Sequence, residues 1–131
     1  MFPKDVRVLI IDDMMTMRKI VKKSLTDLGF SDFIEAVDGA KGWEALTGSD
    51  KAVGLIVSDW NMPNCTGLDL LKRVRAESRF KGLPFVLLTA EAEVSQITEA
   101  MKVGVSGYVV KPFTTESLKV QLENAHKKSA A

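Results

Sequence analysis

Five short, almost uninterrupted apolar runs recur along the chain, and a segment with helical spacing follows each of them. The runs cover residues 6–11, 33–36, 55–58, 85–89 and 107–110. Apolar runs without polar alternation are typical of strands that are covered on both faces. Because parallel strands need crossover connections, the alternation predicts a parallel sheet with helices on both faces. We therefore expect an α/β fold, a doubly wound sheet of five β-α units.

The segments between these runs carry apolar residues at helical spacing. In the first, Met17, Ile20, Val21, Leu25 and Leu28 form one stripe, and Gly29 is placed to end the helix. Four further helices are predicted. One begins at Asp38-Gly39 and runs through Leu46, and the next begins after Thr66, which is placed to cap it. The last two cover residues 92–103, before Gly104, and residues 115–126. Gly42 weakens the first of these four predictions, because an interior glycine costs about 1 kcal/mol relative to alanine.

The bulk composition narrows the possible classes of protein. A chain of 131 residues without internal repeats or linkers is sized for one domain. Its net charge of +1 argues against a nucleic-acid interface, and its single cysteine fits a reducing compartment. No apolar run has the length of a signal sequence or of a membrane span, so we expect a cytoplasmic protein without membrane insertion.

Polar residues follow four of the five predicted strands. Asp12 and Asp13 end the first, Asp59 the third, Thr89 the fourth and Lys111 the fifth. In open α/β sheets, ligands bind outside the carboxyl ends of the strands. Each residue alone has an ordinary structural explanation, and the two adjacent acids could simply form a turn or helix cap. Together they predict a binding site at this edge.

The charges at this edge constrain the ligand. Two carboxylates 4 Å apart repel by about 4 kcal/mol at an effective dielectric constant of 20. One lysine cannot compensate three acids, and a set of oxygen ligands without His or Cys favours Mg²⁺. Carboxylates, a lysine, a hydroxyl and Mg²⁺ together suit phosphoryl transfer, in which an aspartate can be the covalent acceptor.

Four segments carry a family resemblance. "LIIDDMMTMR", "VSDWNMP", "LLTAEA" and "SGYVVKPFT" resemble, in order, the signature blocks of bacterial two-component response-regulator receiver domains. The similarity is greatest to the stand-alone chemotaxis regulators and covers nearly the whole chain. It implies a flavodoxin-like sheet with strand order 2-1-3-4-5, and one receiver domain over residues 1–131 without an output domain.

The resemblance also implies roles for individual residues. Asp59 would accept a phosphoryl group from a chemotaxis-type histidine kinase. Asp13, Asp59 and the main-chain carbonyl of Asn61 would bind Mg²⁺ directly, and Asp12 would act through water. Lys111 would contact the phosphoryl oxygens. Self-catalysed phosphorylation and dephosphorylation would be the only enzymatic activities.

A switch and an output face are implied as well. Thr89 would move toward the phosphoryl group and Tyr108 would turn inward, while Asn61 and Glu91 would tune dephosphorylation. A monomer would then bind a flagellar motor switch protein, with a phosphatase as a further partner. The implied partner face consists of Val94, Ile97, Met101, Tyr108, Val110 and Gln121.

Some positions depart from the family pattern. Thr66 stands where an aspartate is usual, although threonine also caps helices. Met14 replaces a common aromatic residue beside the acidic pair. Val94 and Gln121 replace lysines that well-studied chemotaxis regulators carry on the output face. These departures leave the phosphorylation site intact and put the identity of the partner in question.

Outside the site, ordinary structural roles are the default expectation. Trp43 and Trp60 are expected to pack in the interior, and Trp60 should report ligand binding by fluorescence because it adjoins Asp59. The basic residues of the first helix are expected to form a solvated face; they are Arg18, Lys19, Lys22 and Lys23.

Three alternative functions stay open at this point. A dehalogenase-type aspartyl-phosphate phosphatase would need a D-x-D motif after the first strand, where this chain has adjacent acids. A flavin- or nucleotide-binding module would need a glycine- or hydroxyl-rich loop there. Within the receiver class, the chain could instead be a phosphorelay intermediate or a phosphate sink.

Overall fold

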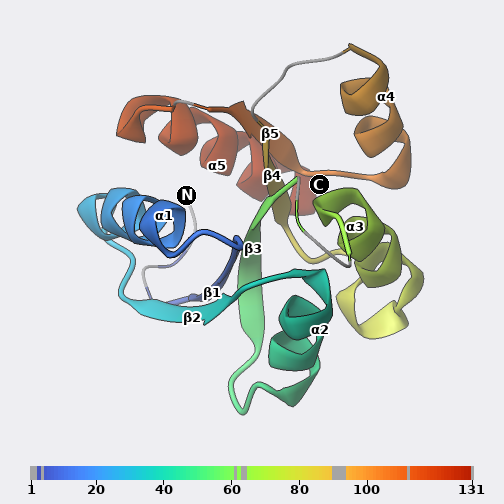
Figure 1. Cartoon of the computed structure of the whole chain (residues 1–131), viewed down its shortest axis with the longest axis horizontal. Helices are drawn as coiled ribbons and strands as arrows, with labels where there is room; N and C mark the ends of the chain where they lie inside the picture. Colours follow the sequence, from blue (N-terminus) through green and yellow to red (C-terminus); the bar gives the residue numbers. More distant parts are fainter. Residues whose placement is uncertain are drawn as a thin grey trace.

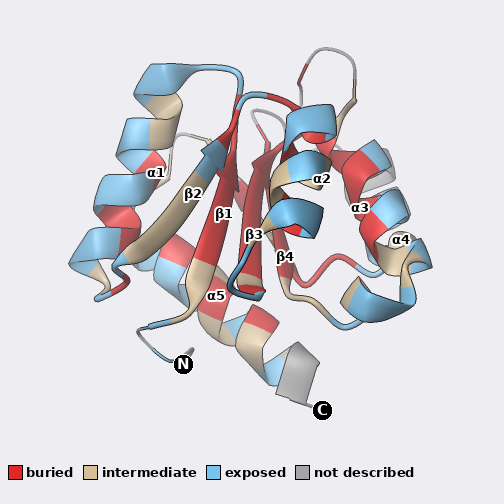
Figure 2. Ribbon diagram, turned by 90° about the horizontal axis from the view of Figure 1, so that it is seen from below, coloured by how far each residue is buried: buried red, intermediate tan, exposed pale blue. Residues whose placement is uncertain are grey.

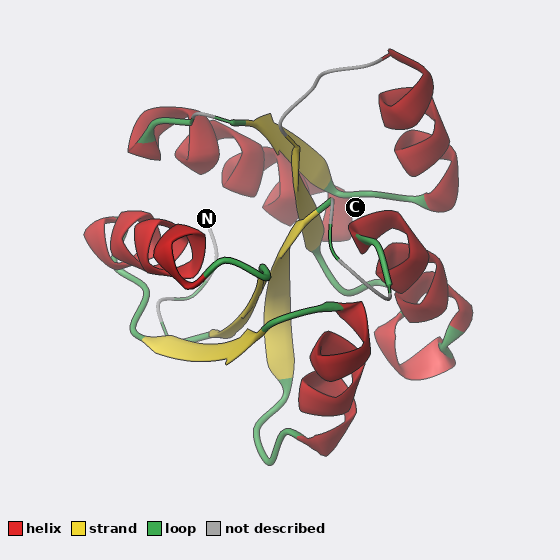
Figure 3. Ribbon diagram, in the orientation of Figure 1, coloured by secondary structure: helices red, strands yellow, loops and turns green. Residues whose placement is uncertain are grey.

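The chain folds into one five-stranded parallel sheet flanked by helices (Figures 1 and 3). The computed structural model describes residues 3, 5–60, 62, 65–89, 94–111 and 113–130. The strands are β1 (Arg7–Ile11), β2 (Asp32–Ala36), β3 (Val53–Asp59), β4 (Phe85–Thr89) and β5 (Gly107–Val110). The helices are α1 (Met15–Asp27), α2 (Gly39–Gly48), α3 (Gly67–Ala76), α4 (Val94–Val103) and α5 (Thr115–Ala130), with a 3₁₀ turn, η1 (Ser78–Phe80). The sheet order is β2-β1-β3-β4-β5, which confirms the predicted fold class.

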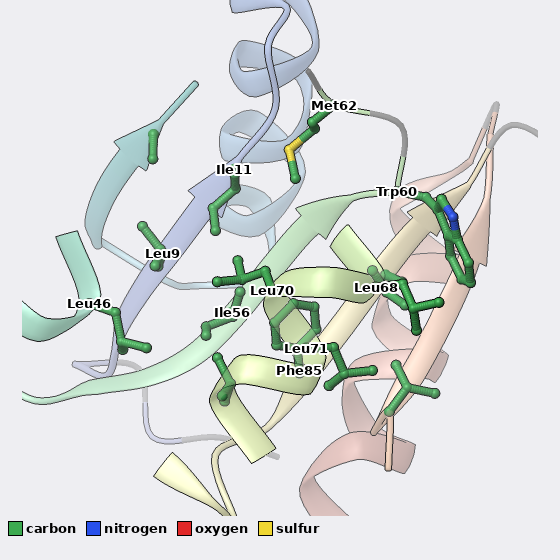
Figure 4. Packing of buried hydrophobic residues seen from close by; sticks show 14 of the residues in the cluster. Leu9, Ile11, Leu46, Ile56, Trp60, Met62, Leu68, Leu70, Leu71 and Phe85 are labelled. Atoms are coloured by element: carbon green, nitrogen blue, oxygen red, sulfur yellow. The ribbon is translucent and has the colours of Figure 1, made fainter. Parts of the chain in front are cut away.

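Helices cover both faces of the sheet, and two apolar cores result (Figure 1). One core lies between the sheet and α1 and α5. The other lies beneath α2, α3 and α4, and Figure 4 shows part of it, with Leu70 and Leu71 of α3 lying over Ile56 of β3 and Phe85 of β4. None of the described helices combines the length and apolar character needed to cross a membrane.

The central strands explain why the apolar runs are continuous. Along β1, Val8 and Ile10 belong to the core beneath α1 and α5, while Leu9 and Ile11 belong to the opposite core. All four are at most 1% exposed. The edge strand β2 is more exposed, as its colouring in Figure 2 shows, and most of its residues are only half-buried.

The first helix differs from its predicted stripe at one position. Ile20 is 45% exposed, so its assignment to the buried stripe is wrong. Ser24 lies buried instead, and its hydroxyl accepts a hydrogen bond from Thr115 at the start of α5. The packing of α5 against α1 rotates the covered face toward Ser24, which the apolar pattern of α1 alone does not reveal.

The helix ends match the predicted signals. Gly29 and Gly104 follow α1 and α4 with φ of 103° and 102°, values that favour glycine. Asp38 caps α2, and Gly42 leaves room inside α2 for the end of the Ile11 side chain, which lies 2.5 Å from where a Cβ would stand. Thr66 caps α3 through a reciprocal pair of bonds with Asp69, so its departure from the family pattern leaves the cap intact.

Candidate functional site

Three carboxylates meet at the carboxyl edge of the sheet. Asp12 and Asp13 directly follow β1, and Asp59 is the last residue of β3. The β1–β3 register pairs Ile11 with Ser58, so the next residues, Asp12 and Asp59, lie side by side. One carboxylate oxygen from each of the three acids lies within 4.8 Å of the others. The predicted clustering of these acids is therefore present.

Lys111 reaches this cluster from the end of β5. Its main-chain N–H donates to the carbonyl oxygen of Thr89 at 2.7 Å, which keeps it beside β4. Its Nζ lies 2.8 Å from Oδ1 of Asp59 and 3.4 Å from Oδ2 of Asp12. The Lys111 side chain is only 17% exposed, and those of Asp12 and Asp59 are less than 10% exposed. One ammonium group thus ties two buried carboxylates together across the sheet.

The surroundings of Asp12 disfavour its ionised form. Burial raises the pKa of Asp12, and the charge of Asp59 raises it further. The N–H of Met14 and the ammonium of Lys111 lower that pKa, but they do not cancel the rise. A raised carboxyl pKa means that the folded protein pays to keep Asp12 ionised. A bound cation would remove that penalty.

The donor set suits a hard divalent cation. The three candidate ligands all offer carboxylate oxygen, and Asp13 is exposed while Asp12 and Asp59 are buried. Oxygen ligands select Mg²⁺ or Ca²⁺ over softer metals. The open side at Asp13 leaves room for water or a phosphate oxygen in the coordination shell. The residues present therefore fit the Mg²⁺ that the sequence predicts.

Hydrogen bonds hold the described residues at the two ends of the segment between Asp59 and α3. The N–H of Trp60 donates to Oδ1 of Asp59 at 3.0 Å and to the carbonyl oxygen of Leu88 at 2.8 Å. The N–H of Gly67 closes the loop by donating to the carbonyl oxygen of Trp60 at 2.9 Å. The indole of Trp60 is buried, as predicted, and it lies near Leu68 in Figure 4.

Sequence reasoning missed the part that Gly67 plays here. A Cβ atom at this position would overlap the carbonyl oxygen of Asp59 and lie 2.8 Å from Leu87. The start of α3 therefore packs directly on the backbone of Asp59, and only glycine allows that approach. The sequence signal was a glycine directly after the capping Thr66, but many helices begin that way.

The two predicted switch residues lie on β4 and β5. Thr89 is 3% exposed at the end of β4 and pairs in register with Val110. Tyr108 is half-buried and packs against the core beneath α2, α3 and α4. Asn61 and Glu91, which were predicted to tune dephosphorylation, lie outside the described residues, as does the side chain of Val94.

Four described residues of the predicted partner face, Met101, Tyr108, Val110 and Gln121, line a groove beside β5 and α5. Met101 and Val110 are 50% and 38% exposed, whereas Ala100, on the other stripe of α4, is buried. Tyr108 and Gln121 line two adjoining hollows of about 320 and 380 Å³ between β5 and α5, and Met101 reaches the smaller one. Ile97 is half-buried. The groove is open to a partner, but its role in binding stays a prediction.

The expectation that all four basic residues of α1 form a solvated face is wrong for one of them. Arg18 does not belong to a solvated face, because its side chain is only 14% exposed and bonds to Glu35 and to the carbonyl oxygen of Asp12. Lys19, Lys22 and Lys23 are exposed as expected.

The two acids after β1 do not cap α1 in the usual way. Met14 is the N-cap residue and makes no side-chain cap bond; its N–H instead donates to Oδ1 of Asp12 at 2.9 Å. Its own side chain, which replaces an aromatic residue usual in the family, is 59% exposed.

Known proteins similar to this chain share both sequence and fold. The chain is 50% identical to the chemotaxis protein CheY of Pseudomonas aeruginosa over 117 residues, which cover 89% of this chain and 93% of that protein. It is 44% identical to CheY1 of Helicobacter pylori over 117 residues, covering 89% and 94%. The crystal structure of CheY4 of Vibrio cholerae at low pH superposes with a TM-score of 0.83 at 33% identity, covering 92% of this chain and 98% of that one.

The family model agrees with these similarities. The model described as "Response regulator receiver domain" matches residues 8–123, a span that includes Asp12, Asp59 and Lys111. This assignment favours a signalling phosphoacceptor over the phosphatase and nucleotide-binding alternatives. The chain belongs to the response-regulator receiver domain family.

Proposed function

We propose that this protein is a chemotaxis-type response regulator that is phosphorylated on Asp59 by a histidine kinase. The observation that carries the proposal is the pair of contacts from Lys111 to Asp59 and Asp12, in a cluster of three acids. A lysine that is held by the acceptor carboxylate before reaction is already positioned to neutralise an incoming phosphoryl group.

The contacts of Asp59 suggest which oxygen reacts. The N–H of Trp60 and the Nζ of Lys111 both bond to Oδ1, and Oδ2 receives neither of these bonds. We assign the attack on phosphorus to Oδ2. The P–N bond of the phosphohistidine breaks as the new P–O bond forms, and the imidazole leaves with the bonding electrons. Lys111 stays near the phosphoryl oxygens and offsets their charge.

Mg²⁺ belongs to the proposed site. Asp13, Asp59 and the main-chain carbonyl of Asn61 would hold it directly, and Asp12 would hold it through water. When bound, the ion neutralises the acids and stabilises charge on the transferring phosphoryl group. Asp13 supplies the exposed side of the site. Dephosphorylation by water would be tuned by Asn61 and Glu91.

Phosphorylation of Asp59 on β3 would act on the partner face at β5, from which it is separated by β4. Thr89 would bond the phosphoryl group, and Tyr108 would pack further inward beside β4. Phosphorylation can favour that state only through contacts that differ between the two states. Because Tyr108 lines both hollows of the β5–α5 groove, its movement would change the shape of the partner face.

The proposed output is binding to a flagellar motor switch protein in the cytoplasm. The similarity to proteins named as chemotaxis proteins in three bacteria supports a role in chemotaxis, and binding to the motor switch protein is the output we propose within that role. Ile97, Met101, Tyr108, Val110 and Gln121 would form the described part of the contact surface, and Val94 belongs to it by the family resemblance alone. A phosphatase would be a further partner.

Replacement of the acceptor tests the phosphorylation step. Wild-type protein incubated with radiolabelled acetyl phosphate and Mg²⁺ should be labelled, and Asp59→Asn should not be, because an amide cannot form the acyl phosphate. Asp27→Asn is a matched control, since Asp27 is an exposed acid on α1 and should label like the wild type. Full labelling of Asp59→Asn would overturn the assignment.

A binding measurement tests the output. Beryllofluoride with Mg²⁺ should mimic the phosphorylated state, and the treated protein should bind a purified flagellar motor switch protein more tightly than the untreated protein. Phosphoryl transfer onward to a second histidine-containing protein, without this difference in binding, would instead establish the relay role.

A further inference from the structure

We propose that Arg18 is a positioning residue for the metal site, and that it sets Mg²⁺ affinity by fixing the backbone that carries Asp12 and Asp13. The inference rests on the proposed function, because it assumes that this acidic cluster binds Mg²⁺. Arg18 lies on α1 and is not itself a candidate metal ligand, since its guanidinium is always a cation.

The loop between β1 and α1 lacks the usual restraint of a helix start. Its N-cap residue, Met14, makes no side-chain cap bond, and α1 has no acidic residue in its first turn. Other bonds hold the loop instead, and they converge on Asp12. Its N–H donates to the carbonyl oxygen of Ala36 at 3.1 Å, and its Oδ1 accepts from the N–H of Met14. Its carbonyl oxygen accepts from Nη1 of Arg18 at 2.8 Å.

That last bond determines the direction of the following residue. The carbonyl of Asp12 and the N–H of Asp13 belong to one planar peptide unit, so a restraint on the oxygen orients the Cα of Asp13. Asp13 is the exposed member of the three acids. The direction of an exposed metal ligand depends mainly on its backbone, because surrounding packing does little to restrain its side chain. Arg18 therefore acts on the least restrained of the three candidate ligands.

Arg18 is itself held in place. Its Nε donates to Oε1 of Glu35 on β2 at 3.1 Å, and its side chain is only 14% exposed. The guanidinium thus bridges the end of β1 to β2 with two different nitrogens. A lysine carries one nitrogen at the end of its side chain, so it cannot keep the two separate nitrogen positions from which Arg18 makes these bonds.

Position and charge predict opposite effects on metal affinity. If Arg18 acts only as a nearby positive charge, it repels Mg²⁺, and removing it should tighten binding. If it acts by orientation, removing it should weaken binding, because residues that orient metal ligands are commonly worth 10–100-fold in affinity. The sign of the change therefore separates the two explanations.

The experiment compares three variants by Mg²⁺ titration, followed through the fluorescence of Trp60, which adjoins Asp59. We expect Arg18→Met to weaken Mg²⁺ binding about tenfold. Arg18→Lys should also weaken it, because the charge remains but the two-nitrogen bridge is lost. Lys22→Met is the matched control. Lys22 lies on the same helix as Arg18, and its Nζ is 3.9 Å from Glu35 of β2. The variant therefore loses a similar charge without losing the bond to Asp12. Its affinity should stay within about twofold of the wild type.

The outcomes are distinct. Unchanged or tighter binding by Arg18→Met, with wild-type affinity in Arg18→Lys, would overturn the role of Arg18 and leave the proposed function standing. No saturable response in the wild type would overturn the proposed function, and this inference with it. Thermal melting without Mg²⁺ checks that each variant is folded. If Arg18→Met fails to fold, Arg18→Lys decides, because the charge explanation requires it to match the wild type.

Discussion

The acids at the amino ends of the strands (the amino edge) and those at the carboxyl ends (the carboxyl edge) have opposite electrostatic surroundings. At the amino edge, the Nε of Arg7 lies 3.0 Å from Asp32 and its Nη1 lies 2.8 Å from Asp50, while Lys51 lies 2.8 Å from Asp32. Hydrogen bonds from Lys51 and Arg7 lower the pKa of Asp32, and the bond from Arg7 lowers the pKa of Asp50. At the carboxyl edge, burial raises the pKa of Asp12.

This difference separates stability from function within one sheet. The amino edge pairs its acids with cations in the resting protein, so its charges favour the folded state. The carboxyl edge gathers three acids around Lys111 and stays short of positive charge. Sites that must bind a ligand commonly cost stability in this way. Removing an acid at the two edges should therefore change the free energy of unfolding in opposite directions.

The largest expected effect comes from crowding the carboxyl edge. Gly67→Ala places a methyl group against the carbonyl oxygen of Asp59, and the backbone must shift to accept it. We expect a loss of about 3 kcal/mol in the free energy of unfolding, measured by urea denaturation, together with slower phosphorylation. Gly48→Ala is the control, because nothing lies within 4 Å of the added Cβ in α2. It should be neutral or slightly stabilising. Equal stability of the two variants would refute the close approach.

A smaller effect of opposite sign is expected from removing an acid at the same edge. Asp12→Asn should raise the free energy of unfolding by about 1 kcal/mol at pH 7 without Mg²⁺, since the folded protein no longer holds a disfavoured charge. The wild type should lose stability as the pH rises from about 4 through the raised pKa of Asp12, and the variant should not show this loss. Melting curves across this pH range measure the difference.

Added Mg²⁺ sharpens the same comparison. The free energy of unfolding of the wild type should rise by about 2.7 kcal/mol at a Mg²⁺ concentration 100 times its dissociation constant, and chelation with EDTA should remove this increase. Asp12→Asn should gain less at that concentration, because its affinity for the ion falls. If Asp12→Asn were less stable than the wild type without Mg²⁺, the inference that ionised Asp12 destabilises the folded protein would be wrong.

The smallest effect is expected at the amino edge, where the ion pairs of Asp32 remain partly exposed to solvent. Asp32→Asn should lower the melting temperature slightly at pH 7, because the carboxylate loses its bonds to Lys51 and Arg7. The lowered pKa of Asp32 stabilises the fold above about pH 4, and this contribution is lost as the pH falls through the lowered value. The wild type and the variant should therefore converge in acid. A difference that persists at pH 2 would point to a cause other than charge.

Much of the fold could be predicted because its signals are local. The apolar runs located all five strands to within two residues at each end, with β4 and β5 matched in full. The polar residues after the strands located the site, since parallel strands bring their carboxyl ends together. The strand order needed the family resemblance, because many orders satisfy the same alternation of strands and helices.

The errors concern features that depend on neighbours distant in sequence. Ile20 has the right spacing for a buried residue, but the position of α5 covers Ser24 instead. Arg18 looks like one of several surface cations, yet Glu35 and the carbonyl of Asp12 hold it against the sheet. The approach of Gly67 to Asp59 depends on how α3 docks, which a single glycine does not encode.

The bond between Lys111 and Asp12 also has a consequence for synthesis of the chain. It joins residues 99 positions apart, and the bond to Asp59 spans 52. A nascent chain exposes Asp12 and Asp59 long before Lys111 leaves the ribosome. Asp59 therefore lacks this cationic partner in any partial chain that ends before Lys111, and closing so long a loop places the pairing late in folding. The pairing of Lys111 with Asp59 is complete only once β5 docks beside β4, so the acidic cluster lacks this cation until the last strand is in place.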